Sequence, residues 1–198
     1  EEIPRVLRQV YTNLGMAILE MLMLPKLLAR NKLSELFDLR RLDIFDQCLE
    51  QGKGCLVVVG HMGNYELGGV VVANKGYPLN SLARPINNRF IDRYVTGIRS
   101  KTGNKIVPTD RAIVEMLRVL RRNEILVIEV DMDAKYDGIL VDFCGRPAST
   151  YRSPALFGIK CGSPIVMINS YRENGKNVVE LTEPIDPKEY GDRDNGVE

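Results

Sequence analysis

A lone histidine followed closely by a carboxylate is the strongest chemical feature of this sequence. The string HMGNYE begins at His61, the one histidine among 198 residues, and ends at Glu66. A spacing of five residues is too long for neighbours on one helix face, which stand three or four apart. It suits a histidine in the turn before a helix and a glutamate in the first turn of that helix, with Gly63 allowing the backbone to fold back.

Such a pair has the chemistry of an oriented general base. A neutral imidazole can accept a proton from an alcohol, and a carboxylate on the other ring nitrogen fixes the tautomer and stabilises the imidazolium as it forms. We therefore predict that His61 is the base and that Glu66 orients it, although a histidine at the end of a strand is also often structural. The N–H groups of Gly63 and Asn64, at the start of the expected helix, are candidates to bind an oxyanion.

No nucleophilic side chain accompanies the histidine. The sequence has no G-x-S-x-G elbow, and no cysteine adjoins His61. Direct attack by an acceptor alcohol is therefore favoured over a covalent enzyme intermediate. A lone histidine also disfavours a conventional zinc hydrolase, whose sites generally use two or three. We predict neither a metal nor a bound cofactor.

Six further residues are candidates for binding a substrate: Arg84, Arg99, Asp131, Asp133, Thr150 and Arg152. A guanidinium can hold a phosphate through two parallel hydrogen bonds, so the two arginines named first are candidate anion binders, with surface ion pairs as the alternative. The two aspartates follow the most apolar run. They could pair with those arginines, which is the favoured interpretation, or bind a cation. The last two residues are alternative donors to an oxyanion.

Strand and helix patterns alternate from residue 42 onward. The runs CLVVVG and ILVIEV are typical of strands buried on both faces of a parallel sheet, and His61 directly follows the first run. Ligands bind outside the carboxyl ends of strands in open α/β sheets. The expected helices are 42–51, 64–75, 90–101, 110–122 with Asp110 as N-cap, and 153–162. The expected strands are 55–60, 81–84, 105–107, 125–130, 139–144 and a hairpin of 164–172 with 177–182. This order predicts an α/β fold with a mainly parallel or mixed central sheet flanked by helices.

The length suits a single domain over residues 1–198, with residues 1–41 as an N-terminal helical segment. The run LGMAILEMLML at residues 14–24 is either a helix packed on the core or a membrane-surface helix. No stretch reaches the roughly 18 uninterrupted apolar residues that a spanning helix needs. Because the chain begins with Glu1, we expect a longer protein whose membrane anchor and C-terminal end lie outside this chain.

Composition excludes several classes of function. Hydrophobic residues make up 44% and charged residues 27%, the balance of a folded domain. The net charge of +1, from 27 basic and 26 acidic residues, gives no overall signal for nucleic acid. The four cysteines form no CxxC pair, which disfavours a zinc knuckle or a redox dithiol.

The segment around His61 resembles the bacterial lipid A biosynthesis acyltransferases. This lauroyl and myristoyl transferase family, in the lysophospholipid acyltransferase-like superfamily, carries an H-x4-D/E motif, usually as HxGNWE. The resemblance covers most of the chain. Other matching segments are Asn13-Leu14-Gly15, Glu20, Gly52-Lys53-Gly54, Arg84-Pro85, Arg99 to Gly103, and the block from Asp131 to Thr150 with Gly138, Val141, Phe143 and Gly145.

The resemblance implies transfer of a fatty acyl chain from acyl carrier protein or coenzyme A to a membrane glycolipid hydroxyl, above all that of a lipid A precursor. It implies His61 and Glu66 as the catalytic pair, with the thioester as co-substrate. The expected partners are the carrier protein or acyl-coenzyme A, the glycolipid acceptor and the membrane surface, and the expected location is the cytoplasmic face of the bacterial inner membrane. The acyl chain requires an apolar groove, since each buried CH₂ contributes about 0.8 kcal/mol.

The sequence departs from the family pattern at several points. Tyr65, Met132 and Cys144 stand where the family usually has tryptophan, glutamine and phenylalanine. The C-terminal W-x-H-x-R-like segment is absent. Alternative hypotheses therefore stay open: a glycerophospholipid or glycosylated phosphatidylinositol acceptor, a hydrolase in which water replaces the alcohol, and a non-catalytic lipid-binding protein.

Overall fold

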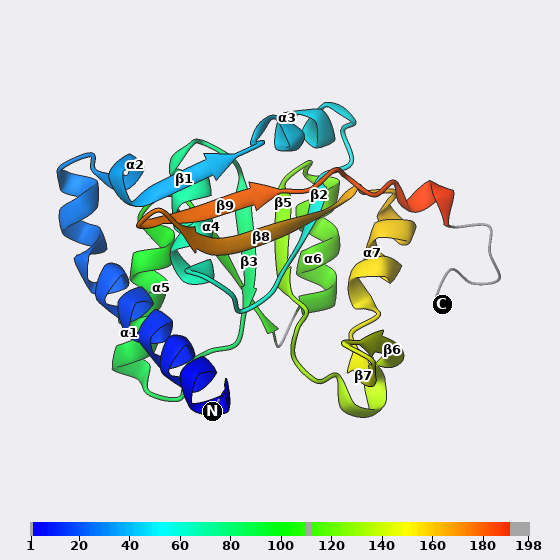
Figure 1. Cartoon of the computed structure of the whole chain (residues 1–198). Coiled ribbons are helices and arrows are strands. Elements are labelled where there is room, and N and C mark those ends of the chain that lie inside the picture. The colour runs from blue at the N-terminus through cyan, green and yellow to red at the C-terminus, as the bar shows by residue number, and fades with distance from the viewer. Residues whose placement is uncertain (1, 110–111, 191–198) are drawn as a thin grey trace.

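The computed structural model, which describes residues 2–109 and 112–190, has a central sheet of seven strands in the order β1-β9-β8-β2-β5-β3-β4 (Figure 1). The strands of this sheet are β1 (Phe37–Arg40), β2 (Cys55–Val59), β3 (Leu79–Ala83), β4 (Lys105–Pro108), β5 (Ile125–Glu129), β8 (Ile165–Glu173) and β9 (Lys176–Leu181). Five of them run in one direction, whereas β9 is antiparallel to β8 and β1 runs with β9. The sheet is mixed and mainly parallel, which confirms the predicted fold class.

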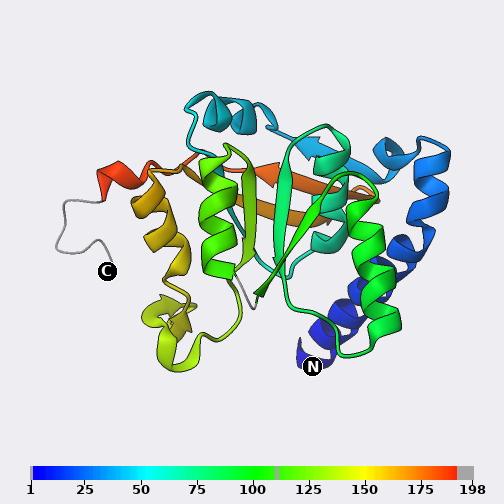
Figure 2. The same ribbon diagram turned by 180° about the vertical axis from the view of Figure 1, so that it is seen from behind.

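Helices cover both faces of the sheet (Figures 1 and 2). They are α1 (Glu2–Ala29), α2 (Leu33–Leu36), α3 (Asp43–Glu50), α4 (Tyr65–Asn74), α5 (Arg89–Ser100), α6 (Ala112–Arg121) and α7 (Ser153–Cys161), with short 3-10 turns at Lys135–Asp137 and Pro187–Glu189. Neighbouring side chains of β2 point to opposite faces: Leu56 packs with residues of α6 and α7, and Val57 with residues of α1, α3 and α4. A strand buried on both faces explains why CLVVV is apolar throughout.

The ends of several helices follow from local chemistry. Asn64 caps α4, because its side-chain oxygen accepts a hydrogen bond from the Leu67 N–H at 3.1 Å. Gly162 ends α7 in the left-handed conformation, with φ of 63°. Both helix ends lie where the sequence predicts them. The predicted cap Asp110 lies outside the described residues.

Two regions differ from the sequence-based expectation. Residues Phe37–Arg40, expected to be helical, form the edge strand β1, which pairs with β9 over four residues, too few for a periodic pattern to show. Strand β6 (Ile139–Phe143) exists as predicted, but it pairs with β7 (Arg146–Thr150) in a separate hairpin outside the main sheet. Cys144 and Gly145 connect the two strands with φ of 55° and 75°, the left-handed pair that a tight hairpin turn requires.

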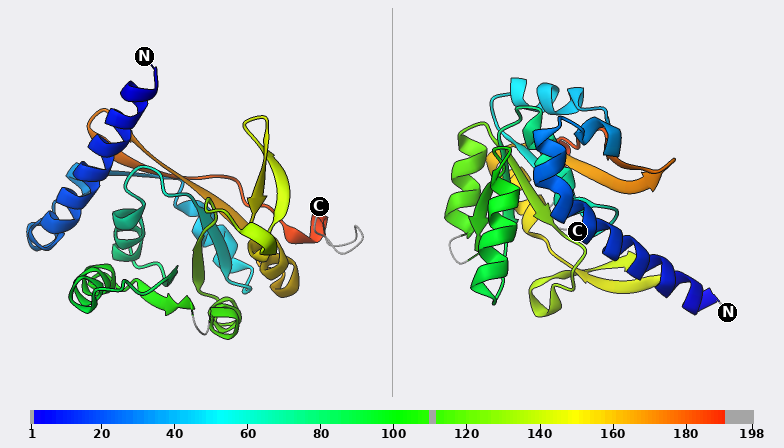
Figure 3. Two further views of the ribbon diagram at one scale, coloured as in Figure 1. Left: turned by 90° about the horizontal axis from the view of Figure 1, so that it is seen from below. Right: turned by 90° about the vertical axis from the view of Figure 1, so that its left-hand side faces the viewer.

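Helix α1 touches the body along one stripe and leaves most of its surface exposed. Leu24 is its fully buried residue, and the half-buried stripe runs from Asn13 to Leu28. The exposed apolar side chains include Ile3, Val6, Leu7, Val10, Leu14, Ile18, Leu19 and Leu22. By length and composition alone α1 could cross a membrane, with a mean hydropathy of 1.3 over its most apolar window. Figure 3 shows the N-terminal half of α1 extending away from the sheet.

Candidate active site

The ends of two adjacent strands bring His61 and Asp131 together. Strands β2 and β5 are parallel neighbours, with Val59 in register with Glu129. His61 lies two residues after the end of β2, and Asp131 lies two residues after the end of β5. The Nδ1 atom of His61 lies 2.6 Å from Asp131 Oδ1, and the His61 backbone N–H donates to Asp131 Oδ2 at 2.7 Å. The contact therefore follows from the register of the sheet.

This contact sets the protonation pattern of the imidazole. An ionised carboxylate only accepts hydrogen bonds, so Nδ1 carries the proton of the neutral ring and Nε2 keeps its lone pair. Burial alone would raise the pKa of Asp131, but the hydrogen bonds from the ring and backbone of His61 outweigh burial and lower that pKa. The His61 side chain is 38% exposed, and among the described residues Nε2 has no hydrogen-bond partner. The basic nitrogen is thus accessible to a substrate.

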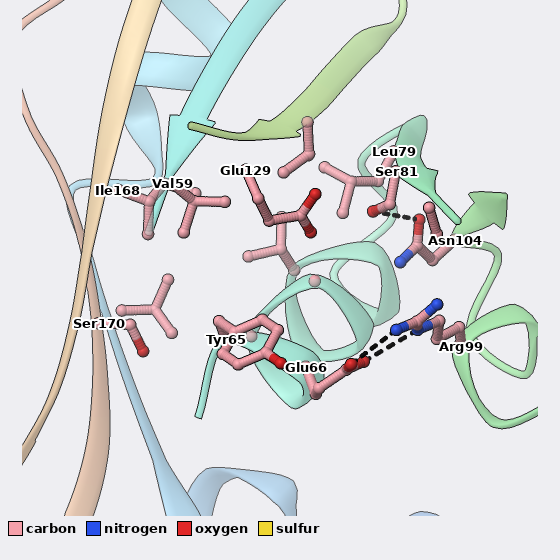
Figure 4. Close-up of a pocket in the computed structure, with 16 residues that line it drawn as sticks. Val59, Tyr65, Glu66, Leu79, Ser81, Arg99, Asn104, Glu129, Ile168 and Ser170 are labelled. Carbon is pink, nitrogen blue, oxygen red and sulfur yellow. Dashed lines mark hydrogen bonds and ion pairs between the residues drawn. The ribbon is translucent and has the colours of Figure 1, made fainter. Parts of the chain in front are cut away.

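The expected contact between Glu66 and His61 is not formed. Glu66, in the first turn of α4, instead accepts two hydrogen bonds from Arg99 of α5, at 2.9 Å from Nε and 2.6 Å from Nη2 (Figure 4). Burial would lower the pKa of Arg99, but the Glu66 carboxylate raises it above its ordinary value. The first turn of α4 points Glu66 towards α5, whereas His61 faces the end of β5. The carboxylate that holds His61 is Asp131.

The turn between His61 and α4 is tightly constrained. Gly63 has φ of 59°, and a Cβ atom there would lie 2.6 Å from atoms of Ser170 on β8. Only glycine fits such a position without strain. The N–H groups of Gly63 and Asn64 donate to no acceptor within the described chain. They remain the candidate oxyanion donors that the sequence predicts, at the N-terminus of a helix.

A pocket lies between α4 and the sheet, next to the His61 turn (Figure 4). The empty space along its walls is about 630 Å³, a figure that includes open solvent, and the enclosed cavity itself is about 50 Å³. Its apolar lining comes from Val59, Val72, Leu79, Val127, Ile168 and Val179. Gly68 and Gly69 of α4 also line it, and their lack of side chains leaves the space open. The Tyr65 ring lines the pocket and meets the His61 ring edge-on, with 4.7 Å between centroids, so the pocket begins beside the imidazole.

Besides Glu66, a second carboxyl group lines this pocket. Glu129, the last residue of β5, points into the space between the sheet and α4 (Figure 4). Burial raises the pKa of Glu129, and its backbone hydrogen bond and the nearby Arg99 only partly oppose that effect. The sequence analysis did not single out Glu129, which it treated as part of the buried strand run ILVIEV.

The other predicted site residues are not gathered around His61. Asp133 is exposed and accepts a hydrogen bond from the Lys135 backbone N–H at 2.9 Å. The expected pairing of Asp131 and Asp133 with arginine is therefore wrong. Arg84 is exposed and directly follows β3, so it lies at the carboxyl ends of the parallel strands, as His61 does. Among the described residues no hydrogen bond links Thr150, at the end of β7, or Arg152, at the start of α7, to His61.

Comparisons with known proteins match this chain to one family and to several relatives. Residues 1–192 match the family described as bacterial lipid A biosynthesis acyltransferase. A phosphatidylinositol mannoside acyltransferase of Mycolicibacterium smegmatis is 23% identical over 146 residues, which are 72% of this chain and 48% of that protein. A protein of the same name from Mycobacterium tuberculosis is 24% identical over 136 residues, 67% of this chain and 43% of its own length.

A third relative is the lipid A biosynthesis acyltransferase of Haemophilus influenzae. It is 26% identical over 110 residues, 55% of this chain and 35% of that protein. The matched region thus spans less than half the length of each of these three relatives. The family match covers nearly the whole chain. It includes the His61 turn, the pocket, and the carboxylates of Glu66 and Asp131. The chain belongs to the bacterial lipid A biosynthesis acyltransferase family.

Proposed function

We propose that this chain transfers a fatty acyl group from a thioester to a hydroxyl of a membrane glycolipid, with His61 as the general base. The observation that carries the proposal is the His61–Asp131 pair at the carboxyl ends of β2 and β5, with a largely apolar pocket beside it and no hydrogen bond from the described residues to Nε2. The family match supports the acyl-transfer class.

The reaction needs no nucleophile from the protein. The acceptor oxygen attacks the thioester carbonyl carbon while His61 Nε2 takes the hydroxyl proton, and the Asp131 carboxylate stabilises the imidazolium. The tetrahedral oxyanion accepts hydrogen bonds from the N–H groups of Gly63 and Asn64. The C–S bond then breaks, and the imidazolium returns its proton to the departing thiolate. Ester and free thiol are the products, and His61 is neutral again.

The pocket is the proposed site of the acyl chain. Its apolar side chains suit a methylene chain, and its mouth adjoins Tyr65 and hence the His61 ring. The Glu66–Arg99 pair closes one side of it (Figure 4). Because Glu66 occupies the Arg99 guanidinium on two nitrogens, the exposed Arg84 is the more accessible of the two predicted phosphate binders.

The proposed substrates and the exposed apolar face of α1 support a membrane location. The exposed apolar side chains of α1, together with Arg5 and Arg8, suit attachment to an anionic lipid surface. We place the site at the cytoplasmic face of the bacterial inner membrane, where acyl carrier protein or acyl-coenzyme A can deliver the thioester. No bound cofactor enters the proposed reaction.

A lipid A precursor is the first proposed acceptor, in keeping with the family description. A second candidate acceptor is a mannosylated phosphatidylinositol, favoured by the names of the mycobacterial relatives. Both acceptors combine a sugar hydroxyl with a membrane-embedded lipid and a phosphate. Mass spectrometry of products formed from both acceptors, each tested with carrier-protein and coenzyme A donors, separates these possibilities.

The decisive experiment replaces the base. The purified protein, assayed in lipid vesicles with a thioester donor and a glycolipid acceptor, should form the acyl ester, and His61→Ala should lower the rate about 10²- to 10⁴-fold. Met62→Ala is the matched control, since this exposed neighbour in the same turn should leave the rate unchanged. Substantial transfer by a folded His61→Ala protein would rule out the mechanism. Thioester hydrolysis that is indifferent to the acceptor would indicate a hydrolase instead.

A further inference from the structure

The stripe of α1 that faces the body is polar at one end and apolar at the other. Met21, Leu24, Leu27 and Leu28 pack on the hydrophobic core. Towards the N-terminus the same stripe presents Asn13 and Glu20, which are half-buried. Residues 2–12, before the stripe, are exposed. The polar end is therefore where the half-buried stripe of α1 begins.

Glu20 is the centre of a dense hydrogen-bond network. Its carboxylate accepts two bonds from Arg172 of β8, at 2.7 and 2.9 Å, one from Asn177 of β9 at 3.1 Å and one from Asn64 at 2.6 Å. The Glu20 and Arg172 side chains are only 12% and 19% exposed. Burial alone would raise the pKa of Glu20, but these donors outweigh burial and lower it. Such a network fixes the relative position of its members.

The network reaches the turn that follows His61 at two consecutive residues. Asn13 Nδ2 donates to the Gly63 carbonyl at 3.1 Å, while Asn13 Oδ1 accepts from Arg172 Nε at 2.9 Å. Asn64, which donates to Glu20, is also the N-cap of α4. Side chains from α1 thus hold the backbone two and three residues after His61, more than 40 positions away in the sequence.

We propose that Asn13 and Glu20 are positioning residues that fix the His61 turn, so that the seating of α1 on the body and the alignment of the imidazole depend on each other. The inference rests on the proposed function for its chemistry, but the geometry stands on its own. The face of α1 opposite the stripe is apolar and exposed. An attached lipid surface would therefore act on the same helix that holds the catalytic turn.

One substitution separates alignment of the turn from attachment of α1. Asn13→Asp keeps an oxygen that can accept from Arg172, and it replaces the donor to the Gly63 carbonyl with a second, repelling oxygen. Gln51→Glu is the matched control, because Gln9 lines a surface depression together with Asn13 and Arg172. Gln51→Glu makes the same amide-to-carboxylate change at the exposed C-terminal end of α3, away from the Arg172 network. Both variants should keep α1 attached, as checked by limited proteolysis.

The expected result is a split between the kinetic constants. A misplaced base costs rate more than binding, so kcat of Asn13→Asp should fall about 10- to 100-fold with KM nearly unchanged, and Gln51→Glu should match the unmodified protein. Because His61 is the one histidine, its ring resonances are identified at once in a nuclear magnetic resonance spectrum. They should shift or broaden in Asn13→Asp and stay unchanged in Gln51→Glu.

Two outcomes would overturn the proposal. One is an unchanged His61 ring signal in Asn13→Asp, whatever the rate does, because the effect would then not pass through the imidazole. The other is a release of α1, or a rise in KM together with a fall in kcat. Either result would indicate a merely structural role. If the unmodified protein transfers no acyl group, the proposed function fails, while the ring signal still tests the positioning of the turn.

Discussion

The two carboxylate pairs near the HMGNYE segment have opposite characters. His61 and Asp131 meet at the ends of two parallel strands, with side chains 38% and 40% exposed. Glu66 and Arg99 join α4 to α5, with side chains 25% and 18% exposed. The first pair leaves a basic nitrogen open to solvent, whereas the second engages a guanidinium on two nitrogens. A motif glutamate five residues from a histidine therefore need not contact it.

The difference between the His61–Asp131 and Glu66–Arg99 pairs suggests a separate role for each. A pair built on adjacent strand ends is held by the rigid sheet and remains accessible, which suits proton transfer. A pair built between two helices fixes their packing and borders the pocket. In the proposed reaction, Asp131 orients His61, and Glu66 shapes the pocket that is proposed for the acyl chain.

The largest expected effect comes from Asp131→Asn. The amide can still accept from the His61 backbone N–H, but its NH₂ group would donate to Nδ1 and move the ring proton to Nε2. The base is then in the wrong tautomer, and kcat should fall about 10²- to 10⁴-fold. Glu66→Gln should cost about tenfold, divided between KM and kcat, because one of its two hydrogen bonds to Arg99 survives. Steady-state kinetics of both variants measure the contrast. A greater kcat loss for Glu66→Gln, with the fold intact, would restore Glu66 as the residue that orients His61.

A smaller effect, on stability, tests the helix-to-helix pair. Arg99→Gln leaves the Glu66 carboxylate partly buried without its cation, so the free energy of unfolding should fall by about 2 kcal/mol. Adding Glu66→Gln to that variant should recover part of the loss, because the unpaired charge is gone. Urea unfolding of the two single variants and the double variant gives the coupling energy, expected at about 1 kcal/mol. Additive losses would mean that the pair contributes nothing beyond its separate residues.

The smallest expected effect compares the two ends of strand β5. Burial raises the pKa of Glu129, so protonation favours the folded state and this stability is lost as pH rises through the raised pKa. Glu129→Gln should therefore unfold with the same free energy as the parent at acid pH, and with about 1 kcal/mol more at neutral pH.

Glu124 serves as the control, because its pKa is shifted in the opposite direction. Lys105, Arg122 and Asn80 outweigh burial and lower the pKa of Glu124, which precedes β5. Its contribution to stability is present at neutral pH and lost as pH falls through the lowered pKa. Glu124→Gln should thus be the less stable protein at neutral pH and equal to the parent in acid. Chemical unfolding between pH 4 and pH 8 compares the two, and parallel curves for both variants would contradict the assignment.

Much of the fold was predictable because its signals are local. The apolar runs of β2 and β5 and the caps at Asn64 and Gly162 are written in neighbouring residues. The edge strand β1 was missed because four residues show no period and its partner β9 lies far along the chain. The β6–β7 hairpin was half missed, since pairing outside the main sheet has no local mark beyond the turn at Gly145.

The candidate site also has features that local sequence predicts and features that it does not. The sequence marked His61 as the base and Gly63 as a turn that needs a left-handed conformation. It also placed Asp131 at the His61 end of the sheet, but with arginine as its partner. The sheet order that sets β2 beside β5 was needed to see that equal two-residue extensions meet.

By itself, the sequence of this protein determines which residue types stand at the ends of its strands and helices, because capping, turns and buried strands depend on near neighbours. Only the tertiary structure decided that His61 bonds to Asp131, that Glu66 bonds to Arg99, and that α1 reaches the turn after His61. The physical reason is that each of these contacts joins segments 33 to 70 residues apart, and strand order and helix packing fix them.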